Sequence, residues 1–126
     1  MTLPPLRALW LGAGWLGVTT VIFFSLVPNP PEVDLRHGDK AQHLLAYAAL
    51  MLWFAQAQKD AATRWATALH LVVMGVSIEL AQGLVGWRHL SAADMAANTL
   101  GVLLGWLAAP PRLPSLYDWA SALVRR

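Results

Sequence analysis

The sequence predicts an all-α membrane protein, a bundle of four transmembrane helices followed by a C-terminal interfacial amphipathic helix. Two observations carry this prediction. Of the 126 residues, 57% are hydrophobic and only 13% are charged, whereas a soluble domain carries roughly 25% charged residues. The apolar residues also gather in four runs, each close to the roughly 20 residues that cross the hydrocarbon of a bilayer. We expect a single transmembrane domain over residues 1–126.

Prolines mark the ends of two of these runs. The first run ends at Pro28-Asn29-Pro30-Pro31 and the fourth at Pro110-Pro111, and proline cannot continue a helix. A cleaved signal peptide is the alternative for the first run, but this apolar run is too long for the hydrophobic core of a typical signal peptide and no Ala-x-Ala site follows it. The second run is marginal in length. The four expected spans cover about residues 8–27, 42–58, 65–85 and 94–109.

Basic residues predict the orientation of the spans, because loops that face the cytoplasm carry an excess of lysine and arginine. With four spans, three of the nine basic residues fall on one side, namely Arg36, Lys40 and Arg88. The larger group predicts that both termini lie in the cytoplasm. It comprises Arg7, Lys59, Arg64, Arg112, Arg125 and Arg126.

The last segment, Ser115–Arg126, is expected to form a short helix on the cytoplasmic surface of the membrane. Leu116, Trp119 and Leu123 recur at helical spacing, and two arginines end the segment. A helix with one apolar face and basic ends typically lies in the plane of the membrane interface.

Several functions are excluded by composition. The chain has no cysteine, so neither a disulfide framework nor thiolate chemistry is expected. Its net charge of +2 does not indicate nucleic acid binding, because the basic residues are scattered around apolar runs. Gly12-Ala-Gly14-Trp-Leu-Gly17 matches the dinucleotide-binding pattern, but it lies inside an expected span without a preceding strand. These glycines are expected to let helices approach closely, and no cofactor is expected.

Polar residues inside the apolar runs indicate a functional site, because an ionisable group within a bilayer costs a few kcal/mol even on mild insertion scales. Glu79 lies in the middle of the run Trp65–Val85, and Gln82 follows on the same helical face together with Gly75. His70 projects from the other side of this helix, and we expect it to make a hydrogen bond between helices.

The fourth run carries a second polar stripe. Asp94, Asn98, Gly101 and Gly105 are spaced so that they lie within about 60° of one another around a helix. Gly101-x-x-x-Gly105 is a pattern typical of closely packed helices. Asp94 and Asn98 then face the same helix contact.

The second run opens with Asp39-Lys40-x-x-His43-x-x-x-Tyr47. These four residues fall within an arc of about 100° on a helix. A structural explanation covers three of them: Asp39 caps the helix, the Lys40 side chain reaches out to the interface, and Tyr47 belongs to the aromatic belt. Insertion into a membrane does not require His43.

These stripes are expected to converge in one polar pocket in the outer leaflet, with Arg88 in the loop above it. The alternative is a structural network in which Arg88 or Lys40 neutralises Glu79 and Asp94. Such a network requires neither His43 nor Gln82 nor Asn98. The expected ligand-binding residues are Asp39, Lys40, His43, Tyr47, Glu79, Gln82, Arg88, Asp94 and Asn98.

The same residues resemble the pattern of the VanZ-like family, over about residues 39–105. This family takes its name from a teicoplanin-resistance protein of Gram-positive bacteria. The resemblance implies a bacterial integral membrane protein of several helices in the cytoplasmic (inner) membrane, and it implies no particular reaction. The matching pieces are Asp39-Lys40-x-x-His43-x-x-x-Tyr47, Glu79-x-x-Gln82, Arg88, Asp94-x-x-x-Asn98 and Gly101-x-x-x-Gly105.

Three hypotheses follow for the function. In the first, the pocket binds an amphiphile of the cell envelope, such as a lipid-linked intermediate or a glycolipopeptide. In the second, the protein is a membrane-embedded hydrolase or transferase for such a lipid, with His43 or Glu79 as general base. A metal variant would use His43, Glu79 and Asp94, but no HExxH-like pair supports it, and no metal is expected. In the third, the chain is a non-catalytic assembly partner of another protein.

Overall fold

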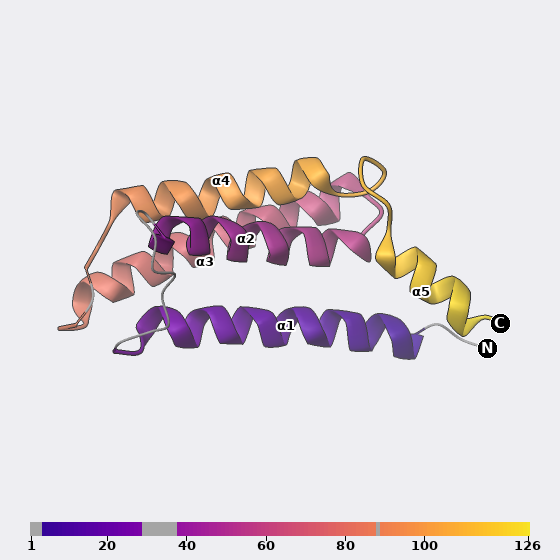
Figure 1. The fold of residues 1–126 in the computed structure, drawn as a ribbon, viewed down its shortest axis with the longest axis horizontal. Helices are drawn as coiled ribbons and strands as arrows, with labels where there is room; N and C mark the ends of the chain where they lie inside the picture. The colour runs from indigo at the N-terminus through magenta and orange to yellow at the C-terminus, as the bar shows by residue number, and fades with distance from the viewer. Residues whose placement is uncertain (1–3, 29–37, 88) are drawn as a thin grey trace.

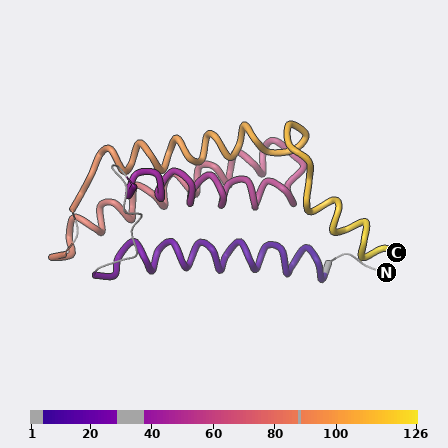
Figure 2. The backbone as a smooth tube through the Cα atoms, viewed as in Figure 1, coloured from indigo at the N-terminus to yellow at the C-terminus, as the bar shows by residue number. Residues whose placement is uncertain are grey.

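The computed structural model describes residues 4–28, 38–87 and 89–126, and these residues form helices without any strand (Figure 1). The all-α class is therefore confirmed for this part of the chain. The four long helices lie side by side, and each runs antiparallel to the one before it (Figures 1 and 2). The helices are α1 (Pro4–Leu26), α2 (Gly38–Gln56), α3 (Ala61–Leu84), α4 (Ala92–Ala108) and α5 (Leu116–Val124).

Helices α2 and α4 form the closest pair because two glycines of α4 face the backbone of α2. A Cβ atom on Gly101 would overlap the carbonyl oxygen of Leu44, and one on Gly105 would lie 2.5 Å from that of Ala48. Only glycine fits at such an approach. The prediction that Gly101-x-x-x-Gly105 packs helices closely is confirmed.

Helix α1 packs against α2 through aromatic residues and two glycines. The Trp10 and Trp53 rings stack with centroids 3.9 Å apart, and each indole N–H donates to the other's backbone carbonyl, at 2.9 and 2.8 Å. Gly14 lies against Phe54, and Gly17 against Leu50. Gly14 and Gly17 therefore pack against α2, as expected, but a Cβ atom on Gly12 would have nothing within 4 Å, so the prediction was wrong for Gly12. The pattern lies inside α1.

The ends of the helices differ slightly from the expected spans. Helix α2 ends at Gln56, two residues before the expected end, because the Ala57 and Gln58 N–H groups bond carbonyls three residues back. Helix α3 begins at Ala61, before the apolar run, because the Asp60 side chain caps it by accepting from Thr63 N at 2.9 Å. A capping side chain satisfies an N–H group that the first turn leaves unpaired.

Within the described residues, two helices, α1 and α3, are long and apolar enough to cross a membrane, and α4 is apolar but shorter, at 17 residues. Large apolar side chains are exposed on these helices, among them Leu16, Leu69 and Leu103. The interior is built mainly from α2 and includes Tyr47, Leu50, Met51 and Phe54.

Helix α5 confirms the expected C-terminal helix. Its first turn is attached to the end of α2, where Gln56 Oε1 accepts from Leu116 N at 2.7 Å. Lys59 Nζ also lies 2.6 and 2.8 Å from the two carboxylate oxygens of Asp118. The predicted apolar face remains uncovered, since Leu116, Trp119 and Leu123 are exposed.

Candidate functional site

Figure 1 shows that α2 begins, α3 ends and α4 begins at the end of the bundle opposite the termini. A cluster of polar side chains lies at this end. We call it the polar cluster. The sequence predicted that these side chains converge, and the structure brings them together. Its members are Asp39, Lys40, His43, Tyr47, Glu79, Asp94 and Asn98.

His43 joins α2 to α4. Its Nδ1 atom lies 2.8 Å from Asn98 Oδ1. An amide oxygen only accepts hydrogen bonds, so Nδ1 carries the proton and donates it. The lone pair of a neutral imidazole is then on Nε2, which lies 3.9 Å from Asp94 Oδ2. This distance is too long for a hydrogen bond, so the Nε2 atom and the carboxylate face each other across a gap.

Lys40 is shared between two carboxylates. Its Nζ atom lies 3.1 Å from Asp39 Oδ2 and 3.4 Å from Asp94 Oδ1. The Lys40 and Asp39 side chains are partly exposed, and exposed ion pairs of this kind contribute at most about 1 kcal/mol.

Glu79 is the deepest charged member of the cluster, with none of its surface exposed. Its Oε1 atom accepts from the backbone N–H of Ser91 at 2.8 Å. Ser91 is also the N-cap of α4, so Glu79 connects α3 to the first turn of α4. One ligand atom from each of His43, Glu79 and Asp94 lies within 4.8 Å of the other two.

Tyr47 lies one turn beyond His43 on α2 and is buried. Its ring and the Asn98 side chain both contact Gly75 of α3, where a Cβ atom would lie 3.3 and 3.2 Å from them. The Tyr47 hydroxyl makes no hydrogen bond within the described part of the chain. Gly75 thus provides the space in which α2 and α4 side chains meet beneath Glu79.

Four predicted residues lie elsewhere or outside the described part. Gln82 is buried, but its Nε2 atom donates to Ser25 O of α1 at 2.7 Å, so it connects α3 to α1. His70 bonds Ala66 O of its own helix at 2.7 Å, and the prediction that it bonds another helix was wrong. Arg88 lies outside the described residues, as does Arg36.

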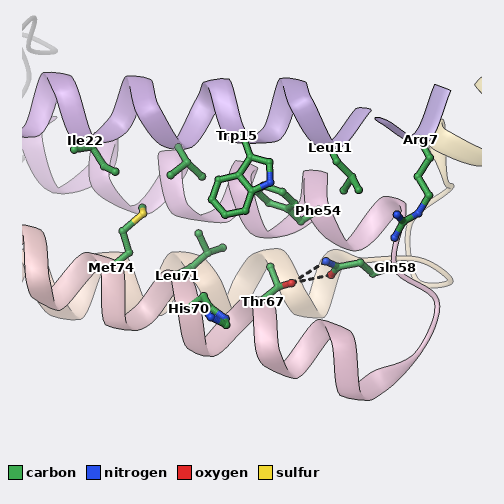
Figure 3. A pocket seen from close by; sticks show the side chains of 11 residues that line it. Arg7, Leu11, Trp15, Ile22, Phe54, Gln58, Thr67, His70, Leu71 and Met74 are labelled. Carbon is green, nitrogen blue, oxygen red and sulfur yellow. Dashed lines mark hydrogen bonds between the residues drawn. The ribbon is translucent and has the colours of Figure 1, made fainter. Parts of the chain in front are cut away.

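The structure also contains a cavity that the sequence did not predict. It has a volume of about 480 Å³ and lies between α1, α2 and α3. Figure 3 shows Arg7, Gln58 and Thr67 at one end, with Ile22 and Met74 at the other. Gln58 and Thr67 bond each other at 2.8 Å. The cavity arises where α1 does not close against α3, and no single residue pattern signals such an opening.

Fold and cluster together define a class: an all-helical bundle with apolar outer faces and one polar cluster inside one of its ends. Comparison with models of protein families, with curated proteins and with solved structures gives no significant match. The resemblance to the VanZ-like family, carried by residues 39–105, stays a prediction.

Proposed function

We propose that this chain is a VanZ-like integral membrane protein that crosses a bacterial inner membrane four times. Helices α1 and α3 have the length and apolarity of spans. Helix α2, of 19 residues, and α4, of 17, are about 28 and 26 Å long at 1.5 Å per residue. A hydrocarbon core of about 30 Å accommodates both beside α1 and α3, since all four lie side by side.

Basic residues support an orientation with both termini in the cytoplasm. The bundle end that holds the termini carries Arg7, Lys59, Arg64 and Arg112, and two more arginines follow α5. Among the described residues, the other end carries a single lysine, Lys40, and no arginine. An excess of basic residues on the cytoplasmic side is the rule for multi-span proteins. The polar cluster then faces the outer leaflet, and α5 lies at the inner surface.

The polar cluster binds the charged headgroup of an envelope amphiphile, in this proposal. The observation that carries it is the sharing of Lys40 between Asp39 and Asp94, at 3.1 and 3.4 Å. A partly exposed ion pair is weak, so an anionic headgroup can replace one carboxylate at little cost. When its Nε2 atom is also protonated, His43, partly exposed beside Asp94, supplies a second charged donor for the same headgroup.

Binding of a polyprenyl phosphate to the detergent-purified chain tests this function. We expect His43→Ala and Lys40→Gln each to weaken binding about tenfold, which corresponds to the loss of one charge-assisted hydrogen bond. His70→Ala is the matched control, because His70 is exposed and bonds its own helix, and its affinity should equal that of the wild type. Equal affinity of His43→Ala and wild type would contradict the proposal. Turnover of the lipid that is lost in Glu79→Gln while binding persists would instead establish an enzyme.

The second candidate function is an assembly partner whose charges only stabilise the bundle, and the Lys40–Asp94 ion pair favours it. Lys40→Asp places a third carboxylate beside Asp39 and Asp94, and we expect it to lower the free energy of unfolding by about 1 kcal/mol. Adding Asp94→Lys should restore stability by reversing the pair. The amphiphile proposal predicts that this double variant regains stability without regaining full binding of polyprenyl phosphate. If binding returns completely with stability, the cluster acts only through folding.

A further inference from the structure

We propose that His43, Glu79 and Asp94 form a binding site for a divalent transition-metal ion, of which Zn²⁺ is the best-suited example. The three residues come from α2, α3 and α4, and one ligand atom of each lies within 4.8 Å of the other two. Ligands of one zinc ion lie roughly 3–4 Å apart when each is about 2 Å from the ion. Small side-chain rotations therefore bring all three atoms onto one ion.

The hydrogen bond of His43 prepares it as a ligand. Because Nδ1 donates to Asn98 Oδ1 at 2.8 Å, the Nε2 lone pair is available and faces Asp94. Metal-binding histidines almost always donate their second N–H to a carbonyl or carboxylate, which fixes the ring and its tautomer. Asn98 is buried and holds this orientation without being a ligand.

The two carboxylates provide oxygen ligands from two different helices. Glu79 is fully buried, and its Oε1 atom accepts from Ser91 N at 2.8 Å, which fixes the carboxylate beside the start of α4. The two carboxylate oxygens of Asp94 have different neighbours: Oδ2 faces His43, whereas Oδ1 faces Lys40. An ion can therefore take Oδ2 while Lys40 stays at Oδ1 or moves toward Asp39. One nitrogen and two carboxylate oxygens form a ligand set that Zn²⁺ accepts.

The buried hydroxyl of Tyr47 is an independent indication that the cluster binds a ligand. Its side chain is 2% exposed, and its hydroxyl makes no hydrogen bond within the described residues. Its ring lies against Gly75 of α3, where a Cβ atom would be 3.3 Å away, and Glu79 lies one turn further along the same helix. Buried hydroxyls are normally hydrogen-bonded. A water molecule on an ion held by Glu79 would satisfy this hydroxyl, and three protein ligands leave a position for such a water.

Zinc binding to the 126-residue chain tests the site, with purification by a tag that contains no histidine. Calorimetry in detergent, without lipid, should give one Zn²⁺ per chain. His43→Ala, Glu79→Gln and Asp94→Asn should each weaken binding at least tenfold, and Asn98→Ala by about tenfold, as partners of metal ligands typically do. His70→Ala and Asp118→Asn are matched controls far from the cluster and should bind as the wild type does.

Zinc-edge X-ray absorption identifies the ligand atoms, and its result for the wild type does not depend on the folding of any variant. We expect one imidazole nitrogen and otherwise oxygen ligands, with the imidazole lost in His43→Ala and kept in His70→Ala. The proposal is overturned if the wild type binds no zinc, if its zinc has no imidazole ligand, or if His43→Ala binds unchanged. Because no lipid is present, these results are separate from those on polyprenyl phosphate.

Discussion

Replacing Gly101 with alanine is expected to destabilise the bundle by about 3 kcal/mol, the upper end of the usual cost of overpacking. The added Cβ would overlap the carbonyl oxygen of Leu44 and lie 3.1 Å from Ala48 N. Both are backbone atoms of α2, so no side chain can move aside. Helix α2 would have to shift away from α4. Titration of the purified chain with a denaturing detergent, followed by tryptophan fluorescence, measures the change in the free energy of unfolding.

Gly12→Ala is the matched control for this substitution. Gly12 also lies within a helix, but a Cβ atom there would have nothing within 4 Å. Alanine exceeds glycine in helix propensity by about 1 kcal/mol, so Gly12→Ala should be neutral or slightly stabilising. If Gly101→Ala proves as mild as Gly12→Ala, the close contact between α2 and α4 is not what holds the bundle together.

The same substitution tests how the fold creates the site. Asn98 and Gly101 lie on one face of α4, and both are buried against neighbouring helices. The hydrogen bond between His43 and Asn98, at 2.8 Å, requires α2 and α4 to lie close together. We therefore expect zinc binding in Gly101→Ala to weaken along with stability, although Gly101 is not a member of the polar cluster.

Much of the fold could be predicted because apolar runs and breakers act locally. The apolar runs predicted the long helices and their order, and the glycine spacing in α4 predicted its close packing against another helix. The predicted end residues of the helices were less exact, because the end of α2 and the start of α3 depend on turn and capping hydrogen bonds. The cavity between α1 and α3 was not predicted, since it depends on how two distant helices pack.

The polar cluster could be predicted for a different reason. A charged group in an apolar helix must face other polar groups, so Glu79 and Asp94 were expected to lie beside other polar side chains inside the bundle. The hydrogen-bond partners of the polar side chains were less predictable, since Gln82 donates to a backbone carbonyl of α1 rather than to the polar cluster. A metal site was not expected because no HExxH-like pair is present. A site assembled from three helices needs no such local spacing, and only the tertiary structure brings its ligands together.

Replacing Arg64 with alanine is expected to cost about 3 kcal/mol at the opposite end of the bundle. The guanidinium donates to three backbone carbonyls, those of Gln58 at 2.8 Å, Pro110 at 2.6 Å and Ala55 at 3.0 Å. Hydrogen bonds to a charged group contribute about 1.5–3 kcal/mol each, and water restores part of this at a partly buried site. The same denaturing-detergent titration measures the loss.

Arg112→Ala is the control for the charge of Arg64. Arg112 is exposed and makes one long bond to Leu107 O, at 3.4 Å, so its loss should change stability by less than about 0.5 kcal/mol. Arg64→Lys keeps the charge but lacks the planar fork that reaches several carbonyls, and it should recover less than half of the loss. Full recovery by lysine would show that charge at this end of the bundle, rather than the three carbonyl contacts, accounts for the role of Arg64.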